Sequence, residues 1–161
     1  QLLGSGTILR EVIAAADLLR QDWGIEADIW SCPSFTQLAR DGEDAARWNL
    51  LHPTATPRKS YVEQCLENTE GPVIASTDYV RAFADQIRPF VPHRYKVLGT
   101  DGFGRSDTRE KLRHFFEVDR KWVTVAALSS LAEEEKLDRA KVGEAIKKYS
   151  LDPEKPNPLT V

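Results

Sequence analysis

The amino-acid sequence predicts a single α/β domain, with a mostly parallel sheet of about five strands and helices on both faces. Its 161 residues are the usual length of one domain with one core. Short apolar runs alternate along the chain with segments in which apolar residues recur at helical spacing. Because helices then separate the strands, crossover connections are needed, and these favour parallel strands.

Four short apolar segments are the strand candidates, and they comprise Leu2 and Leu3, residues 27–31, residues 73–75 and residues 95–98. Each is followed along the chain by a segment with helical periodicity, as crossover connections require. Residues 122–131 share an apolar helical face, but their Val-Thr-Val segment also leaves a strand open.

The helices are predicted from apolar stripes and from residues that suit helix ends. Thr7 can cap the first helix, Gly24 suits its C′ position, and Thr77 can cap a later one. Residues 34–37 have the Ser-x-x-Gln form of a capping box that opens a short helix. The remaining helical stripes cover residues 8–19, 43–51, 61–66, 79–87, 108–116, 122–131 and 142–149.

Residues 1–150 are expected to form the domain, and the Pro-rich residues 151–161 to form an extended, poorly packed tail. The chain contains no Met, and it enters its first strand-like segment at once. A natural N-terminus usually has some disordered slack, so we expect a domain excised from a longer chain.

Composition excludes several classes of protein. With 41% hydrophobic and 29% charged residues, the chain is neither disordered nor membrane-spanning. A formal net charge of -3 without any Lys/Arg run argues against nucleic-acid binding. Two cysteines make no disulfide framework, and nothing resembles a signal peptide, so we expect a reducing compartment, the cytoplasm.

Gly4, Ser5, Gly6 and Thr7 follow a strand and open a helix, which is the context of a dinucleotide fingerprint. The third glycine of that fingerprint falls at Leu9, so a tight turn is favoured over a nucleotide site. The backbone N–H groups of this turn remain a candidate site for an anion.

The most distinctive segment is the loop of Asp101, Gly102, Phe103, Gly104, Arg105, Ser106 and Asp107. It follows a predicted strand at the sheet edge where α/β proteins place functional loops. Asp107 and Glu110 fit a capping box, and Arg105 offers a cationic fork. Two interpretations stay open: a structural loop in which Arg105 pairs with Asp101 or Asp107, and an interface or substrate-channel loop.

No catalytic constellation is evident from the sequence. The histidines, His52, His93 and His114, form no metal-binding pattern, and Cys32 and Cys65 are interpreted as small buried side chains. Asp41, Arg47 and His52 lie in an irregular stretch rich in Trp, His and Pro, which makes an interface plausible there.

Five short motifs stand out along the chain: SFTQLARDG (34–42), RWN (47–49), LHP (51–53), ASTDY (75–79) and LGTDGFGRSD (98–107). Together they resemble one family, the carboxyl-terminal domain of the homodimeric bacterial pyruvate dehydrogenase E1 component. The resemblance runs along the whole chain and implies the transketolase C-terminal fold.

The resemblance implies a full-length enzyme that uses thiamine diphosphate and Mg to decarboxylate pyruvate and pass the acetyl group to the lipoyl arm of E2, dihydrolipoamide acetyltransferase. It implies that the other E1 domains and a second E1 subunit are partners. It places no catalytic, cofactor-binding or metal residue in this chain, because the family's Gly-Asp-Gly-type motif is absent. Dimer assembly and the rim of the active-site channel are the expected roles. The alternative is a stand-alone anion- or nucleotide-binding regulatory module that uses the turn from Gly4 to Thr7.

Overall fold

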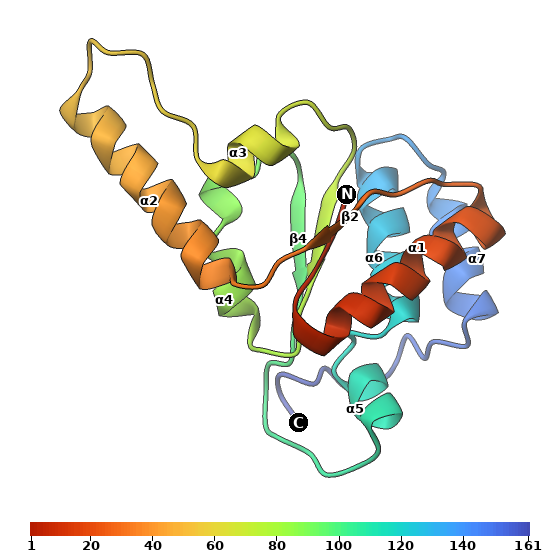
Figure 1. Cartoon of the computed structure of the whole chain (residues 1–161). Helices are drawn as coiled ribbons and strands as arrows, with labels where there is room; N and C mark the ends of the chain where they lie inside the picture. Colours follow the sequence, from red (N-terminus) through yellow and green to blue (C-terminus); the bar gives the residue numbers. More distant parts are fainter.

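The computed structural model describes residues 1–161 and contains one sheet of four parallel strands. The strands are β1 (Leu2–Gly4), β2 (Ile29–Ser31), β3 (Val73–Ser76) and β4 (Tyr95–Leu98), in the spatial order β2-β1-β3-β4. All four strand candidates are confirmed. The expected number of about five strands was one too many, since the sheet has four. Figure 1 shows this sheet between two groups of helices.

Seven α-helices surround the sheet, and short 3₁₀ turns cover Gly6–Ile8 and Arg88–Phe90. Helices α1, α6 and α7 pack on one face of the sheet, and α2, α3 and α4 lie on the other (Figure 1). The helices are α1 (Leu9–Trp23), α2 (Phe35–Leu51), α3 (Tyr61–Leu66), α4 (Arg81–Asp85), α5 (Arg109–Phe115), α6 (Arg120–Glu133) and α7 (Arg139–Lys148).

Alternation along the strands divides the core between the two faces. Leu2 and Ile74 point into the cluster beneath α1, α6 and α7, whereas Leu3, Val73 and Ala75 point into the cluster beneath α2, α3 and α4. All five side chains are buried, as expected for a parallel sheet covered on both faces. The fold class predicted from the sequence is therefore confirmed.

The segment 122–131, which left a strand open, lies within α6. Asp119 fixes the start of this helix, because its Oδ1 accepts hydrogen bonds from the backbone N–H groups of Lys121 at 2.9 Å and Trp122 at 3.1 Å. The hydroxyl of Thr124 donates to the carbonyl of Arg120 at 2.7 Å, so this polar group is satisfied inside the core. Helix α6 is buried around most of its circumference, since it packs against α1, α7 and the sheet.

Two predicted helix ends are confirmed and two are wrong. Gly24 ends α1 with φ +66°, and Ser34 caps α2 by accepting a hydrogen bond from the N–H of Gln37 at 3.1 Å. Thr7 does not cap α1, because a 3₁₀ turn precedes that helix. Thr77 is buried and accepts a hydrogen bond from the Ser5 hydroxyl, so it does not cap α4.

Helix α2 continues through Gly42, where the sequence suggested two separate segments. A Cβ added at Gly42 would lie 2.3 Å from ring carbons of Phe90. The glycine therefore lets the helix cross closely over the 3₁₀ turn that carries Phe90.

The tail was expected to be extended and poorly packed, but it folds back onto the domain. Leu151 and Pro158 are buried, and backbone hydrogen bonds close turns over 152–155 and 157–160. The carbonyl oxygen of Pro158 lies 2.1 Å from the place where a Cβ of Gly102 would be, and Gly102 has φ +102°. Glycine at 102 thus lets the tail pack against the loop that follows β4.

Candidate functional site

The turn at the end of β1 is held by its own side chains. The hydroxyl of Ser5 donates to Oγ1 of Thr77 at 2.8 Å, and the hydroxyl of Thr7 donates to Oδ2 of Asp78 at 3.3 Å. Gly6 has φ +52°. An anion approaching this turn would meet the carboxylate of Asp78, so these contacts favour the structural turn over an anion site.

The loop of residues 101–107 is exposed along most of its length. Asp101 accepts a hydrogen bond from Nε of Arg81 at 2.6 Å, which ties the loop to the start of α4. Arg105 pairs with neither Asp101 nor Asp107; its guanidinium carbon instead lies 5.2 Å from the ring centre of Phe115. Of the two interpretations left open by the sequence, the one in which Arg105 pairs with Asp101 or Asp107 is therefore wrong.

The predicted capping box of Asp107 and Glu110 is wrong, because α5 begins one residue later with a simple side-chain cap. Thr108 is the N-cap, and its Oγ1 accepts from the N–H of Lys111 at 3.4 Å. Asp107 accepts from the N–H of Thr108 at 2.7 Å and lies 3.7 Å from the ammonium of Lys111. Asp107 therefore contacts the N-cap residue that precedes the helix and does not cap the first turn itself.

The end of helix α2 and the segment after it form a projection, the α2 arm, which we define as residues 47–60. Figure 1 shows it extending away from the sheet, and every residue from Leu50 to Lys59 is exposed. Leu50 and Leu51 are 78% and 55% exposed. Arg47 is also exposed and makes no ion pair within the chain.

The α2 arm is nevertheless internally ordered. The ring of His52 stacks on Trp48 with 4.2 Å between ring centres, and Arg58 lies 4.1 Å from the centre of the Trp48 ring. The amide of Asn49 donates to the carbonyl of Arg58 at 2.9 Å and accepts from its N–H at 2.7 Å. His52 thus has a structural contact within the arm.

Asp41 lies before the α2 arm and also has a structural contact. Its carboxylate accepts from the N–H of Tyr61 at 2.6 Å, which joins α2 to the start of α3.

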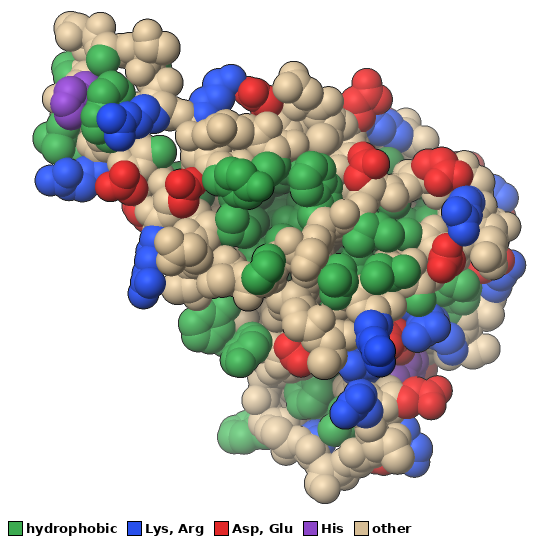
Figure 2. All heavy atoms as spheres, viewed as in Figure 1, with side chains coloured by type: hydrophobic (Ala, Val, Ile, Leu, Met, Phe, Trp, Pro, Cys, Tyr) green, Lys and Arg blue, Asp and Glu red, His purple; other side chains and the backbone are tan.

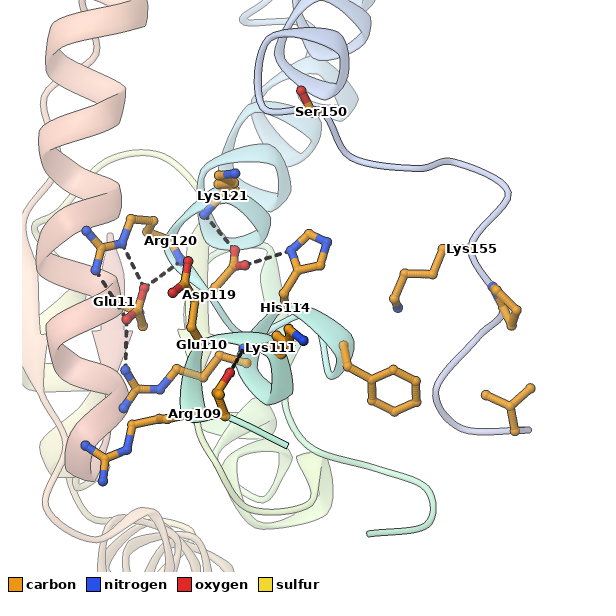
Figure 3. A pocket seen from close by; sticks show the side chains of 15 residues that line it. Glu11, Arg109, Glu110, Lys111, His114, Asp119, Arg120, Lys121, Ser150 and Lys155 are labelled. Atoms are coloured by element: carbon orange, nitrogen blue, oxygen red, sulfur yellow. Dashed lines mark hydrogen bonds and ion pairs between the residues drawn. The ribbon is translucent and has the colours of Figure 1, made fainter. Parts of the chain in front are cut away.

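A cleft of about 1200 Å³ lies between α1, α5, the start of α6 and the tail, and we call it the basic cleft (Figure 3). Figure 2 shows Lys and Arg side chains gathered over this region. It is lined by Glu11, Thr108, Arg109, Glu110, Lys111, Arg113, His114, Phe115, Asp119, Arg120, Lys121, Ser150, Lys155, Pro156 and Val161.

Glu11 is the buried centre of one wall of the basic cleft. Its carboxylate is 3.0 Å from Nη1 of Arg113 and 2.9 Å from Nε of Arg120, and it accepts from the backbone N–H of Arg120 at 3.1 Å. Burial by itself raises the pKa of Glu11, but the hydrogen bonds from Arg120 and the charges of both arginines outweigh it. The pKa of Glu11 therefore lies below its ordinary value, and the carboxylate stays charged.

Sequence reasoning missed the basic cleft. Its cations are dense between Arg109 and Lys121, and this local density was the available signal. Glu11 and Lys155 gave no signal, because each lies far along the chain from α5 and reaches the cleft only through the fold.

The cysteines and histidines form no metal site. No group of three or more His, Cys, Asp or Glu side chains is placed to hold a metal ion. Cys32 is buried, and burial, together with the nearby Cys65, raises the pKa of its thiol to about 12. No helix of the chain is both long and apolar enough to cross a bilayer.

The four-stranded parallel sheet and its helices define the class of protein. The chain belongs to the transketolase-like C-terminal domain family, and the model of that family matches residues 1–119. A solved structure, "Split gene transketolase, inactive beta4 tetramer", has the same fold, with a TM-score of 0.53 and 16% identity over 81% of this chain and 38% of that one.

Within this family, the chain is similar to proteins named "Pyruvate dehydrogenase E1 component". It is 74% identical over its whole length to the one from Cupriavidus necator, 64% identical over 99% of its length to that of Pseudomonas aeruginosa, and 54% identical over 98% to that of Escherichia coli K12. The chain spans 18% of the length of each relative. The resemblance predicted from the sequence is confirmed.

Proposed function

We propose that this chain is the carboxyl-terminal domain of a pyruvate dehydrogenase E1 component, the enzyme that decarboxylates pyruvate with thiamine diphosphate and Mg²⁺ and transfers the acetyl group to the lipoyl arm of dihydrolipoamide acetyltransferase. The observation that carries this proposal is the 74% identity over all 161 residues. Its proposed compartment is the cytoplasm.

The domain's part in that enzyme is assembly rather than chemistry. The family's Gly-Asp-Gly-type diphosphate and metal motif is absent from this sequence, so the residues of this chain do not fit a thiamine diphosphate–magnesium site of that kind. We therefore assign no reaction step to any residue of this chain, and propose that the cofactor is held by the other domains of the E1 subunits.

The α2 arm is the proposed contact with another part of the E1 dimer. Leu50 and Leu51 expose apolar surface without any cover from the chain, and Arg47 beside them has no carboxylate partner. The arm is ordered by the stack of His52 and Arg58 on Trp48. A pre-ordered surface loses less conformational entropy on association, which favours binding.

The loop of residues 101–107 is proposed as the second contact, at the rim of the active-site channel. Phe103 is 76% exposed, and the guanidinium of Arg105 has no carboxylate partner within the domain. An exposed aromatic ring beside an arginine is a combination enriched at protein interfaces.

The enzymatic part of the proposal is tested by pyruvate-dependent release of CO₂ with thiamine diphosphate and Mg²⁺ supplied. The protein that carries this chain at its natural length is expected to release CO₂. The separate 161-residue chain is expected to release none, and titration calorimetry is expected to detect no thiamine diphosphate binding. A natural-length protein that is folded but inactive with pyruvate would contradict the assignment to the E1 component. Cofactor binding by the separate chain would contradict the proposal that the other E1 domains hold the cofactor.

The assembly role is tested by changing Leu50→Asp and Leu51→Asp together in the natural-length protein. We expect the dimer dissociation constant, measured by sedimentation, to rise at least about tenfold, because two apolar anchors become charged. The unfolding temperature of the dissociated chain should hardly change, since both side chains are exposed. Ile13→Asp, at another exposed apolar position, is the matched control. If the double substitution leaves the dimer dissociation constant unchanged, the α2 arm is not part of the dimer interface.

A further inference from the structure

The basic cleft carries a positive charge that the rest of the chain does not share. Six of its lining residues are Lys or Arg and three are Asp or Glu, whereas the whole chain has a formal net charge of -3. Cations held close together in a concave surface raise the local potential, and they attract ligands of the opposite charge.

Two of the three acids of the cleft are already engaged, and two of its six cations have no carboxylate partner. The third acid, Glu110, is exposed and forms no ion pair. Glu11 faces two arginines at once, and Asp119 both caps α6 and accepts from His114 at 3.0 Å. Lys155 pairs outside the cleft with Glu117 at 2.8 Å.

Neither Arg109 nor Lys121 has a carboxylate within ion-pair distance of its side chain. Their charges are therefore free to meet a ligand.

The walls of the cleft are fixed before any ligand arrives. Arg113 has only 16% of its side chain exposed. The side chain and the backbone N–H of Arg120 both donate hydrogen bonds to the carboxylate of Glu11. Figure 3 shows Arg109 and Arg120 on the side of Glu11, with His114 and Lys155 on the side of the tail. Fixed guanidinium groups form bidentate contacts with phosphate or carboxylate at a small entropic cost.

The polarity of the lining restricts the class of ligand. Phe115 and Val161 are the hydrophobic residues among the fifteen that line the cleft. Sites for apolar small molecules are lined mainly by apolar side chains, and this cleft is not. Its volume of about 1200 Å³ and concave shape suit a small molecule better than a flat protein surface.

We propose that the basic cleft binds a small, multiply anionic ligand bearing phosphate or carboxylate groups, with Arg109, Arg120 and Lys121 supplying the main contacts. This site goes beyond the proposed E1 function and does not depend on it. Its affinity comes mainly from charge, so binding weakens as the salt concentration rises.

The test is titration calorimetry on the natural-length protein with inorganic tripolyphosphate and, separately, with citrate. The thiamine diphosphate site is first saturated with cofactor and Mg²⁺, and the surplus is removed by gel filtration. We expect the double variant Arg109→Ala/Lys121→Ala to raise the dissociation constant about tenfold, since two charge contacts of about 0.7 kcal/mol each are lost. Glycerol, which is polar but uncharged, should not bind.

The matched control removes the same two residue types elsewhere. Arg139→Ala/Lys147→Ala changes an exposed Arg and an exposed Lys on α7, which have no ion-pair partner and do not line the cleft. This variant should bind with an unchanged dissociation constant, and both variants should melt at the parental temperature.

Binding of tripolyphosphate alone identifies a phosphate ligand, and binding of citrate as well identifies a general polyanion site; both support the proposal. No binding of either probe, or binding that the cleft variant and the control weaken equally, overturns it. Loss of pyruvate turnover plays no part in this test, so its outcome is distinct from that of the E1 assignment.

Discussion

Replacing Glu11 with alanine will lower the free energy of unfolding by about 3 kcal/mol or more, because it breaks a buried ion-pair cluster. Glu11 is 6% exposed, and its carboxylate accepts hydrogen bonds from Arg113, 102 residues away, and Arg120, 109 residues away. Without the carboxylate, Arg113 keeps a largely buried charge with no partner. The α6 N-terminus also loses the acceptor for the backbone N–H of Arg120. Urea unfolding of the variant and the parent measures the difference.

Glu110→Ala is the matched control for this change. Glu110 lines the same cleft but is exposed and has no ion-pair partner, so its loss should cost less than about 0.5 kcal/mol. A Glu11→Ala variant as stable as the Glu110→Ala variant would contradict the cluster described at α1, α5 and α6.

The ion-pair cluster around Glu11 also predicts how the stability of the fold changes with pH. Since the folded-state pKa of Glu11 lies below its ordinary value of 4.5, the carboxylate stabilises the fold above that pH. Its contribution is lost as the pH falls from 4.5 through the folded-state pKa. The stability difference between the parent and Glu11→Gln should therefore be constant near neutral pH and shrink below pH 4.5. A difference that does not change with pH would contradict the charged state assigned to Glu11.

Replacing Leu128 with alanine is expected to cost about 2–5 kcal/mol, the range for a large-to-small change in a packed core. Leu128 is 0% exposed and lies on α6 in the cluster that joins α1, α6 and α7 to the sheet. Because neighbouring side chains relax only partly, the change leaves a cavity as well as removing buried apolar surface. Thermal and urea unfolding give the cost.

Leu50→Ala is the control of the same type in the α2 arm. Leu50 is 78% exposed, so this substitution should change the unfolding free energy of the chain by less than about 0.5 kcal/mol. A Leu128→Ala variant that loses less than about 1 kcal/mol would mean that α6 is not packed in the core as described.

The sequence predicted what depends on neighbouring residues. Alternating apolar runs located all four strands, and the positive φ required at the end of α1 was recognised from Gly24. Ser34 could be recognised as a cap, because the hydrogen bond of a cap spans only three residues. The five short motifs between residues 34 and 107 were sufficient to predict the family.

Local signals failed where the sequence allowed two local structures, or two residues for one helix cap. Asp107 and Thr108 are both good caps, and the backbone geometry selected Thr108 as the N-cap. Residues 122–131 could be read as helix or strand, and burial of α6 between α1, α7 and the sheet selected the helix.

The interpretation of the candidate sites needed the tertiary structure throughout. Asp78 meets Thr7 across 71 residues, and Glu11 meets Arg120 across 109, so the charge of the Gly4–Thr7 turn and that of the basic cleft depend on contacts that no local pattern contains. Short-range periodicity and capping thus determined the elements and their order. Long-range packing and electrostatics decided which polar side chains satisfy one another inside the domain and which remain exposed on its surface.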